Sequence, residues 1–447
     1  MKLTRDELKD TTPKKNGKRL SMSLLNKRNI TLISVGAFTW SLFFAIQGQF
    51  LNDYIADFGN YTPMKISLMI SIVALTGAII SILAGSLSDN LRISFGRRKV
   101  FIILGGTLSA LLVLLFPVSK TIAGIIVLNI VIGILNTAAF VCNNSFIPDI
   151  SDEENLGKTN AVAAIGTSFG TVAGFAIMLI PFSTIVFILT GILCAIGFII
   201  TGLFIQEPEV IAPPKKWLEE IKNTFQLRNL KKEKNFFSFL ISHFLLHTGI
   251  SVYLPFLLIF LTQENNPQSG ELIGLGLSIQ NGQVLIVFTA MTLVALLATL
   301  PFGFFIDKTD TGIFLIISRV LFAVTTGILA ITPLLKINPL IIGILFIIPF
   351  SISNSADIIS RGALMQQLAP GEKRGQFLGL TIFVKIIAQI PGVIIGGLIA
   401  QFSQSGYQYA FLVGGIFLLL SVPFLIMARS PTLKEQKAKN KLVAQAV

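Results

Sequence analysis

The side chains in this sequence that could bind a polar solute or carry a proton lie inside long apolar segments. Carboxamides both donate and accept hydrogen bonds, while His and Asp can take up or release a proton. The residues concerned are Gln47, Gln49, Asn129, Asn136, Asn143, Asn144, His243, His247, Tyr253, Asn354, Asp357, Lys385 and Gln389. Because such side chains are unfavourable in lipid, we expect them to face a polar interior.

Eight of these residues are candidates for a functional site. The candidate substrate-binding residues are Gln47, Asn136, His247, Asn354, Lys385 and Gln389. The candidate ion-coupling residues are His243 and Asp357. Amides beside one His and one Lys suit the hydroxyls of a neutral or weakly anionic polyhydroxyl solute.

Residues four apart share a helical face, and three such pairs occur here. The pairs are His243 with His247, Asp357 with Arg361, and Lys385 with Gln389. A His pair can bind a metal, but no Cys or carboxylate lies near it in the sequence, so we expect a solvated face and no metal site.

Two arginines in these segments need a separate explanation. Asp357 and Arg361 can form a local ion pair, which we favour, or a proton-coupling site. Arg319 is expected to extend to the membrane surface along its own helix.

The segments that carry these residues are long enough to cross a membrane. The 447-residue chain is 53% hydrophobic and only 13% charged, which excludes a soluble fold. Since a membrane helix needs roughly 20 apolar residues, we predict twelve spans. They are 30–55, 66–88, 100–118, 121–145, 159–181, 184–205, 236–262, 283–305, 313–334, 339–361, 376–400 and 409–428.

The basic residues indicate the orientation of the spans. The chain has 35 Lys and Arg against 22 Asp and Glu, a net charge of +13. With both termini in the cytoplasm, 30 of the 35 basic residues fall on the inner side, as the positive-inside rule requires. The charge therefore indicates topology and no nucleic-acid partner. The basic first 28 residues indicate a cytoplasmic tail and not a signal peptide.

The longest inner loop divides the spans into two groups of six. We predict a cytoplasmic N-tail at 1–28, bundles at 29–205 and 236–428, a cytoplasmic linker at 206–235 and a C-tail at 429–447. Within the linker, residues 215–227 form either an interfacial helix or a solvated segment.

An internal repeat relates the two groups. At an offset of 218 residues, glycine, acidic and Asn positions recur. The pairs are Gly85 with Gly303, Asp89 with Asp307, Asn136 with Asn354, Glu154 with Glu372, Gly157 with Gly375, and Gly174 with Gly392. This pattern predicts a duplicated six-helix unit with parallel halves.

The loop after the second span has a glycine, acidic and basic pattern. It reads Gly85-Ser-Leu-Ser-Asp89, and it continues to Gly96-Arg97-Arg98; the second half has a shorter form, Gly303-Phe-Phe-Ile-Asp307-Lys308. Together with the twelve spans, these loops resemble the major facilitator superfamily over essentially the whole chain. The resemblance implies an all-α membrane fold of two pseudo-symmetric six-helix bundles with both termini cytoplasmic. It also implies a conformational gate of Gly85, Asp89, Gly96, Arg97, Arg98, Gly303, Asp307 and Lys308.

Two details bear on the subgroup. The long spacing from Asp89 to Gly96 resembles the sucrose:proton symporter group and its glycoside-pentoside-hexuronide cation symporter relatives. In contrast, Gly166, Gly170 and Gly174 in the fifth span partly resemble a drug-antiporter motif, although this spacing is also typical of close helix packing.

The resemblance implies a secondary transporter in the cytoplasmic membrane, a monomer among membrane lipid that works without a cofactor. Spans 1, 4, 7 and 10 would line its cavity, and spans 3, 6, 9 and 12 would face lipid. Proton- or sodium-coupled uptake of a sugar or glycoside is our first hypothesis, and proton-coupled efflux of amphipathic compounds is the alternative. A membrane-embedded enzyme is a remote alternative, because the sequence has no group of residues with the types and spacing of a catalytic motif.

Overall fold

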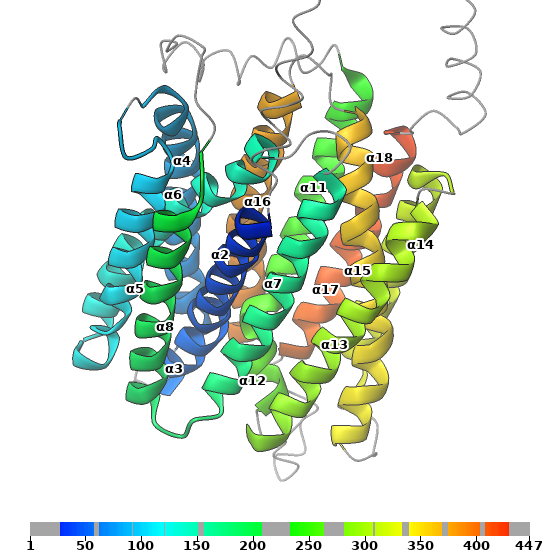
Figure 1. Cartoon of the computed structure of the whole chain (residues 1–447). Helices are drawn as coiled ribbons and strands as arrows, with labels where there is room; N and C mark the ends of the chain where they lie inside the picture. Colours follow the sequence, from blue (N-terminus) through cyan, green and yellow to red (C-terminus); the bar gives the residue numbers. More distant parts are fainter. Residues whose placement is uncertain are drawn as a thin grey trace, which may run out of the picture.

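The structure, a computed structural model, describes residues 27–57, 62–91, 93–119, 121–150, 156–207, 233–262, 281–306, 309–332, 339–368, 374–402 and 407–428. Within these ranges all regular secondary structure is helical, and twelve membrane-length segments run side by side as a bundle (Figure 1). Nine of the described helices are long and apolar enough to span a membrane by length and composition alone.

Six segments form the N-terminal half. The first is continuous through α2 (Lys27–Ala45), the π-helical η1 (Ile46–Phe50) and α3 (Leu51–Asp57). The second is α4 (Pro63–Asn90), and the third joins the π-helical η2 (Phe101–Thr107), α5 (Leu108–Val113) and the 3-10 turn η3 (Phe116–Val118). The remaining three are α6 (Ile122–Ile150), α7 (Leu156–Met178) and α8 (Ser183–Phe204).

Six more segments form the C-terminal half. The first joins α11 (Lys234–Tyr253), the 3-10 turn η4 (Leu254–Phe256) and α12 (Leu257–Thr262). It is followed by α13 (Asn281–Ile306), α14 (Thr311–Leu329), α15 (Pro339–Leu368) and α16 (Arg374–Phe402). The last segment is α17 (Tyr407–Leu420) with α18 (Val422–Met427). We call the end of the bundle where α2 begins and α18 ends the tail side, and the opposite end the distal side.

The twelve predicted spans coincide with these segments to within a few residues at most boundaries. The largest difference is in α15, which continues past the predicted end at 361 to Leu368. Helix starts carry local signals: Thr62 accepts a hydrogen bond from the Lys65 amide before α4, and Asp310 accepts from the Gly312 amide before α14. Such capping satisfies amides that have no partner within the helix.

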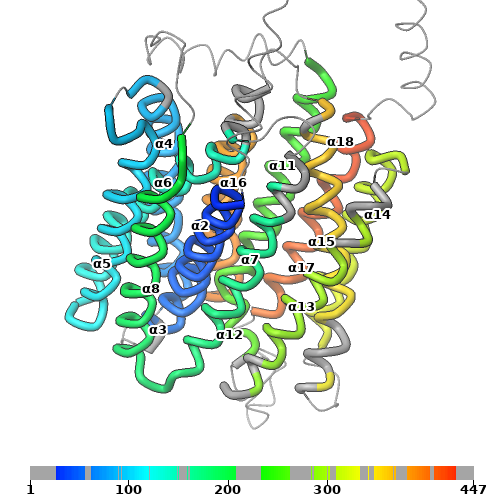
Figure 2. Tube along the Cα trace, viewed as in Figure 1, coloured from blue at the N-terminus to red at the C-terminus, as the bar shows by residue number. Residues whose placement is uncertain are grey.

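The same packing pattern occurs in both halves, which confirms the predicted duplication. In the N-terminal half α2 packs on α7 and α8, α4 on α6, and η2 on α6 and α8. In the C-terminal half the equivalent contacts are α11 with α16 and α17, α13 with α15, and α14 with α15 and α17. The two halves meet along α4 with α16 and along α7 with α13, and Figure 2 shows the green α7 beside the yellow-green α13.

Glycines bring the first and fifth helices of each half into close contact. A Cβ added at Gly170 of α7 would lie 2.2 Å from the Phe38 carbonyl oxygen of α2, and one at Gly166 would lie 2.2 Å from that of Ser34. In the other half, a Cβ at Gly392 of α16 would lie 2.3 Å from the Thr248 carbonyl oxygen of α11. Only glycine fits at such distances. The glycine spacing in α7 is therefore explained by helix packing.

Rows of exposed aliphatic side chains show which helices face lipid. They recur every three or four residues along the third, sixth, ninth and twelfth segments, as the resemblance implied, and also along α4, where Leu68, Ile72, Leu75 and Ile79 form an equally exposed row. The rows are Leu104, Leu108, Leu111 and Leu115 in η2 to η3; Ile185, Ile188, Ile192 and Ile196 in α8; Ile313, Ile317, Leu321 and Val324 in α14; and Leu412, Ile416 and Leu419 in α17. In contrast, the first segments of the halves, α2 and α11, are enclosed by neighbouring helices.

The halves make specific contacts on the distal side. The rings of Phe175 in α7 and Phe288 in α13 stack with their centroids 3.9 Å apart. The Gln49 side chain donates to the Leu254 carbonyl oxygen at 2.9 Å, and the Asn52 side chain donates to that of Pro255 at 3.3 Å. These bonds join η1 and α3 to η4, so the distal ends of the first and seventh segments are held together. The Gln49 side chain therefore belongs to the contact between the two halves.

Candidate functional site

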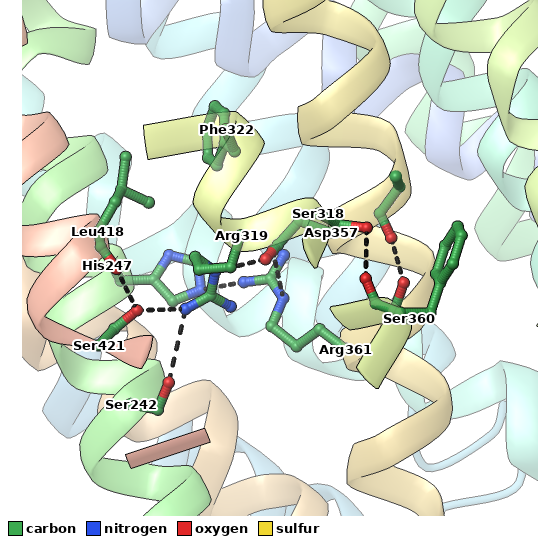
Figure 3. Close-up of polar contacts among 12 residues, drawn as sticks. Ser242, His247, Ser318, Arg319, Phe322, Asp357, Ser360, Arg361, Leu418 and Ser421 are labelled. Atoms are coloured by element: carbon green, nitrogen blue, oxygen red, sulfur yellow. Dashed lines mark hydrogen bonds and ion pairs between the residues drawn. The ribbon is translucent and has the colours of Figure 1, made fainter. Parts of the chain in front are cut away.

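A buried ionic network joins four segments of the C-terminal half. The Arg319 guanidinium from α14 donates through Nε to Oδ1 of Asp357 in α15, and the side chains of both residues are only 1% exposed. Its Nη1 also donates to the Ser421 hydroxyl at 2.7 Å and to the Ser242 hydroxyl at 3.5 Å. Figure 3 shows the guanidinium between these groups. A charge without a partner would be strongly unfavourable here, so this pairing is what allows Arg319 to be buried.

The expectation that Arg319 extends to the membrane surface is wrong. Its side chain is fully buried, because Asp357 and two hydroxyls on neighbouring helices supply partners inside the bundle. The two hydroxyls belong to Ser242 and Ser421, which the sequence did not single out. A signal was available: Arg319 and Asp357 are opposite charges in two spans, and charges within membrane spans usually pair.

A second guanidinium extends the network toward α11. Arg361 Nε lies 3.5 Å from Asp357 Oδ2, which confirms the local ion pair, and Arg361 Nη1 lies 2.9 Å from His247 Nε2. An arginine can only donate, so Nε2 of His247 must accept, and the imidazole is neutral with its proton on Nδ1. The Arg361 side chain is 13% exposed, unlike the fully enclosed Arg319 and Asp357.

The two histidines of α11 lie one turn apart and touch. Their ring centroids are 4.5 Å apart with the rings at 75°, and the other face of His243 stacks on Phe239 at 5.8 Å. Nδ1 of His243 is buried and has no hydrogen-bond partner among the described residues. In that part of the chain no third His, Cys, Asp or Glu joins the pair to hold a metal ion.

Lys385 of α16 adds a further positive charge to this region. Its ammonium lies within electrostatic range of Arg361 and of both histidines. Within the described chain it makes no hydrogen bond or ion pair, and its side chain is half-buried. The network therefore contains three full positive charges, on Arg319, Arg361 and Lys385, against the single carboxylate of Asp357.

The amides of the N-terminal half form a separate polar group. Gln47, in the π-helical turn η1, donates to Oδ1 of Asn129 in α6 at 2.8 Å. Asn136, two turns further along α6, is buried, and its Oδ1 has no partner among the described residues. A π-helical turn interrupts the regular ladder of backbone bonds and is frequent at functional sites. Among these amides, the Asn136 oxygen is the hydrogen-bonding group that the described fold leaves unsatisfied.

The structure thus brings together four of the eight candidate site residues. His243, His247, Asp357 and Lys385 belong to one network, whereas Gln47 pairs with Asn129, and Asn136 lies on α6 in the other half. Asn354 and Gln389 are half-buried on α15 and α16, one turn before Asp357 and one turn after Lys385. Polar side chains with this exposure within a membrane span are expected to reach water or substrate and not lipid.

The loop after α4 is held in place by one carboxylate. Glu207, just after α8, accepts hydrogen bonds from the backbone amides of Arg97, Arg98 and Lys99 at 2.8, 2.9 and 2.8 Å. Those amides begin the third segment, where an anion is favoured. Gly96 has φ +116, a conformation that a side chain would strain. The sequence did not single out Glu207, because the contact spans more than a hundred residues.

The other candidate gate residues lie in different surroundings. The guanidinium of Arg98 is buried and donates to the Ser145 carbonyl oxygen of α6. A Cβ at Gly85 would lie 3.7 Å from Val141, an ordinary contact, so space alone does not require glycine there. Asp89 lies in the last turn of α4 and Gly303 in the last turn of α13. Asp307 and Lys308 lie outside the described residues, as does the predicted interfacial helix at 215–227.

Comparisons with known proteins agree with this architecture. The sequence profile of the Major Facilitator Superfamily matches residues 30–279 and, again, 239–446. Among solved structures, the nucleoside transporter NupG has a TM-score of 0.72 at 14% identity and covers 89% of this chain and 99% of its own. The human organic anion transporter MFSD10 has a TM-score of 0.65 at 14% identity, covering 89% and 99%.

A D-xylose-proton symporter has a TM-score of 0.64, again at 14% identity, and covers 89% of this chain and 96% of its own. None of the curated proteins compared with the chain matches it. At these identities the solved structures establish a common fold, and any assignment of substrate has to come from the residues of this chain.

Proposed function

We propose that this chain, which belongs to the major facilitator superfamily, takes up a small polyhydroxyl solute, a sugar or glycoside, by symport with a proton. Membership of the superfamily makes the chain a multi-pass membrane transporter of a small molecule and not an enzyme. The solute, the direction and the coupling ion are the proposal, and sodium is the alternative ion.

The hydrogen bond from Arg361 to His247 is the observation that carries the proton coupling. It requires a neutral imidazole, so protonation of His247 would remove the acceptor and place two cations in contact. His243 touches the same imidazole, and Asp357 holds the other side of Arg361. A proton arriving at any one of these groups changes the bonding of the others, which is what coupling to transport requires.

The amides support a polyhydroxyl solute. The unsatisfied oxygen of Asn136 can accept a hydrogen bond from a hydroxyl, and the half-buried carboxamides of Asn354 and Gln389 can each donate to or accept from one. Their chain positions on α6, α15 and α16 place them in both halves, as a site between rocking bundles needs. The loop after α4 is a further argument for a sugar. Its long spacing from Asp89 to Gly96 resembles that of the sucrose:proton and glycoside-pentoside-hexuronide symporters.

Transport would proceed by alternating access of the two halves, which we assign to 29–205 and 236–428. The distal contacts of Phe175 with Phe288 and of Gln49 with η4 would break as the distal side opens. The loop held by Glu207, with Asp89 and its counterpart Asp307, would act as the gate on the tail side.

The distribution of basic residues supports a cytoplasmic tail side, a location in the cytoplasmic membrane and both termini inside. We assign a monomer as the working unit.

The glycines of α7 no longer favour efflux of amphipathic compounds. Gly166 and Gly170 each face a backbone carbonyl of α2 at a distance that admits no side chain, so packing accounts for them. We therefore keep uptake as the one proposed direction.

Counterflow in proteoliposomes tests the proposal. Vesicles loaded with one sugar or glycoside should accumulate the labelled form, and an inward proton gradient should drive net uptake with alkalinisation of the medium. Protein-free vesicles provide the control. Absence of counterflow for every mono- and disaccharide, neutral or acidic, would contradict the solute, while uptake that follows sodium and ignores pH would contradict the proton.

A further inference from the structure

The charges in the C-terminal half do not balance. Arg319 and Asp357 neutralise each other at close contact, with the carboxylate directed to Arg319 through Oδ1. Arg361 then has only the longer 3.5 Å pairing to Oδ2 of the same carboxylate. Lys385 has no ion pair among the described residues. Taken together, the described side chains of the network have two positive charges in excess.

An excess of this kind within a membrane span is unfavourable unless something compensates it. Charges buried in a low-dielectric region need a partner, and removing the partner of a buried pair is strongly destabilising. The imidazoles of His243 and His247 offer no negative charge. The compensation must therefore come from outside this group of side chains.

The two cations that lack a strong partner are also less buried than the Arg319 and Asp357 pair. Arg361 is 13% exposed and Lys385 is half-buried, whereas Arg319 and Asp357 are 1% exposed. Arg361 uses Nε for Asp357 and Nη1 for His247, and Nη2 makes no hydrogen bond with the described residues. A guanidinium edge and a nearby ammonium, both with donors to spare, match the oxygens of an anionic group.

From this arrangement we infer that the transported solute is an organic anion, whose carboxylate binds between Arg361 and Lys385. The inference rests on the proposed function in taking this region as the substrate site, and it names the class of solute for that site. Amides of the N-terminal half would contact the uncharged part of the solute. One carboxylate cancels one of the two excess charges. The second excess positive charge remains, and it favours the bound solute over solute in water.

Binding of paired solutes by purified protein tests the inference. Thermal stabilisation and counterflow are measured with D-glucose against D-glucuronate, D-xylose against D-xylonate, and glycerol against lactate. We expect the anionic member of at least one pair to bind at least tenfold more tightly than its neutral partner. D-Glucose 6-phosphate is included because phosphate presents similar oxygens, and phosphate without carboxylate binding would overturn the assignment to a carboxylate.

The panel separates this inference from the proposed function. Sugar acids that bind while neutral sugars do not would support both. Neutral sugars that bind while their acids do not would overturn the anion and leave sugar transport standing. Lactate without any sugar or sugar acid would support the anion and refute sugar transport, and no binding at all would overturn both.

Lys385 provides the matched variants. Because it has no partner in the described fold, Lys385→Gln should fold, and loss of one charge-assisted contact should weaken anion binding by about tenfold to a hundredfold. Lys385→Arg keeps the charge and should remain within a few-fold of the parent. Lys65→Gln, at the distal start of α4, is the control for charge alone. Equal anion affinity in Lys385→Gln and the parent would overturn the inference.

Discussion

Arg319 and Asp357, which are 38 residues apart in the sequence and belong to different helices, form an ion pair that is sealed from solvent inside the C-terminal half. The pair joins α14 to α15, and the Ser421 hydroxyl ties the same guanidinium to the last segment. It is the fixed part of the network. Arg361 and Lys385 are its less buried part, and the buried His247 lies against Arg361.

Breaking this pair on one side should destabilise the protein more than removing it. Asp357→Asn leaves Arg319 buried without a counter-charge, and we expect a loss of about 3–5 kcal/mol. The double variant Arg319→Gln with Asp357→Asn removes both charges and should recover most of that loss. Thermal unfolding in detergent measures both effects. A double variant no more stable than the single one would contradict the assignment.

The same variants test ion coupling. If Asp357 takes part in proton coupling, Asp357→Asn should exchange solute across the membrane and should not accumulate it against a gradient. The double variant separates this effect from folding, because it lacks the carboxylate without leaving Arg319 buried and unpaired. Gradient-driven accumulation at the parental level in the double variant would exclude Asp357 from coupling.

His247 should make stability depend on pH. Its bond to Arg361 exists only while the imidazole is neutral, so the stabilisation is present at higher pH and is lost as His247 becomes protonated on acidification. The charged and titratable groups around it are Arg361, Lys385, Arg319, Asp357 and His243. His247→Gln keeps an acceptor at every pH.

Between about pH 8 and pH 5, where a histidine titrates, the melting temperature of the parent should therefore fall more than that of His247→Gln. His243→Gln is the comparison variant, since it removes an imidazole but retains the bond, and a pH dependence lost in His247→Gln and retained in His243→Gln assigns that dependence to the bond. Identical pH profiles for His247→Gln and the parent would show that this bond does not titrate.

Glu207 should hold the loop after α4 in place through the backbone amides of residues 97–99. Replacing it with Ala leaves three backbone amides without their acceptor, and we expect a loss of about 1–3 kcal/mol for a half-buried, charge-assisted set of bonds. Counterflow should also be slower in this variant, because the loop is part of the proposed gate on the tail side. Glu233→Ala, before α11, is the matched control, since its side chain caps nothing. Protection of the 97–99 amides from hydrogen exchange reports on the contact directly.

The glycines of α7 should be intolerant of even one methyl group. Gly170→Ala would place a Cβ 2.2 Å from the Phe38 carbonyl oxygen, so α2 and α7 must separate, and we expect a loss of about 1–3 kcal/mol. Gly327→Ala meets nothing within 4 Å and should be neutral or stabilising by up to about 1 kcal/mol. Equal melting temperatures for the two variants would contradict the close approach of α2 and α7.

The sequence by itself determined the number of spans, their approximate ends and the duplication. Each span is decided locally, because some twenty apolar residues favour lipid whatever their neighbours are. The repeat was visible because equivalent helices keep glycine and Asn at equivalent positions, as at Gly174 and Gly392. His243 and His247, four residues apart, were correctly expected to share a face for the same local reason.

Only the tertiary structure decided which charges meet. Arg319 was expected at the membrane surface, and Asp357 was paired in the sequence only with Arg361, its neighbour one turn away. The partner that holds Asp357 most closely comes from another helix, as does the Glu207 carboxylate for Arg97 and Arg98. Such contacts depend on how each helix is rotated and tilted, which is set by packing between helices and leaves no periodic trace along the chain.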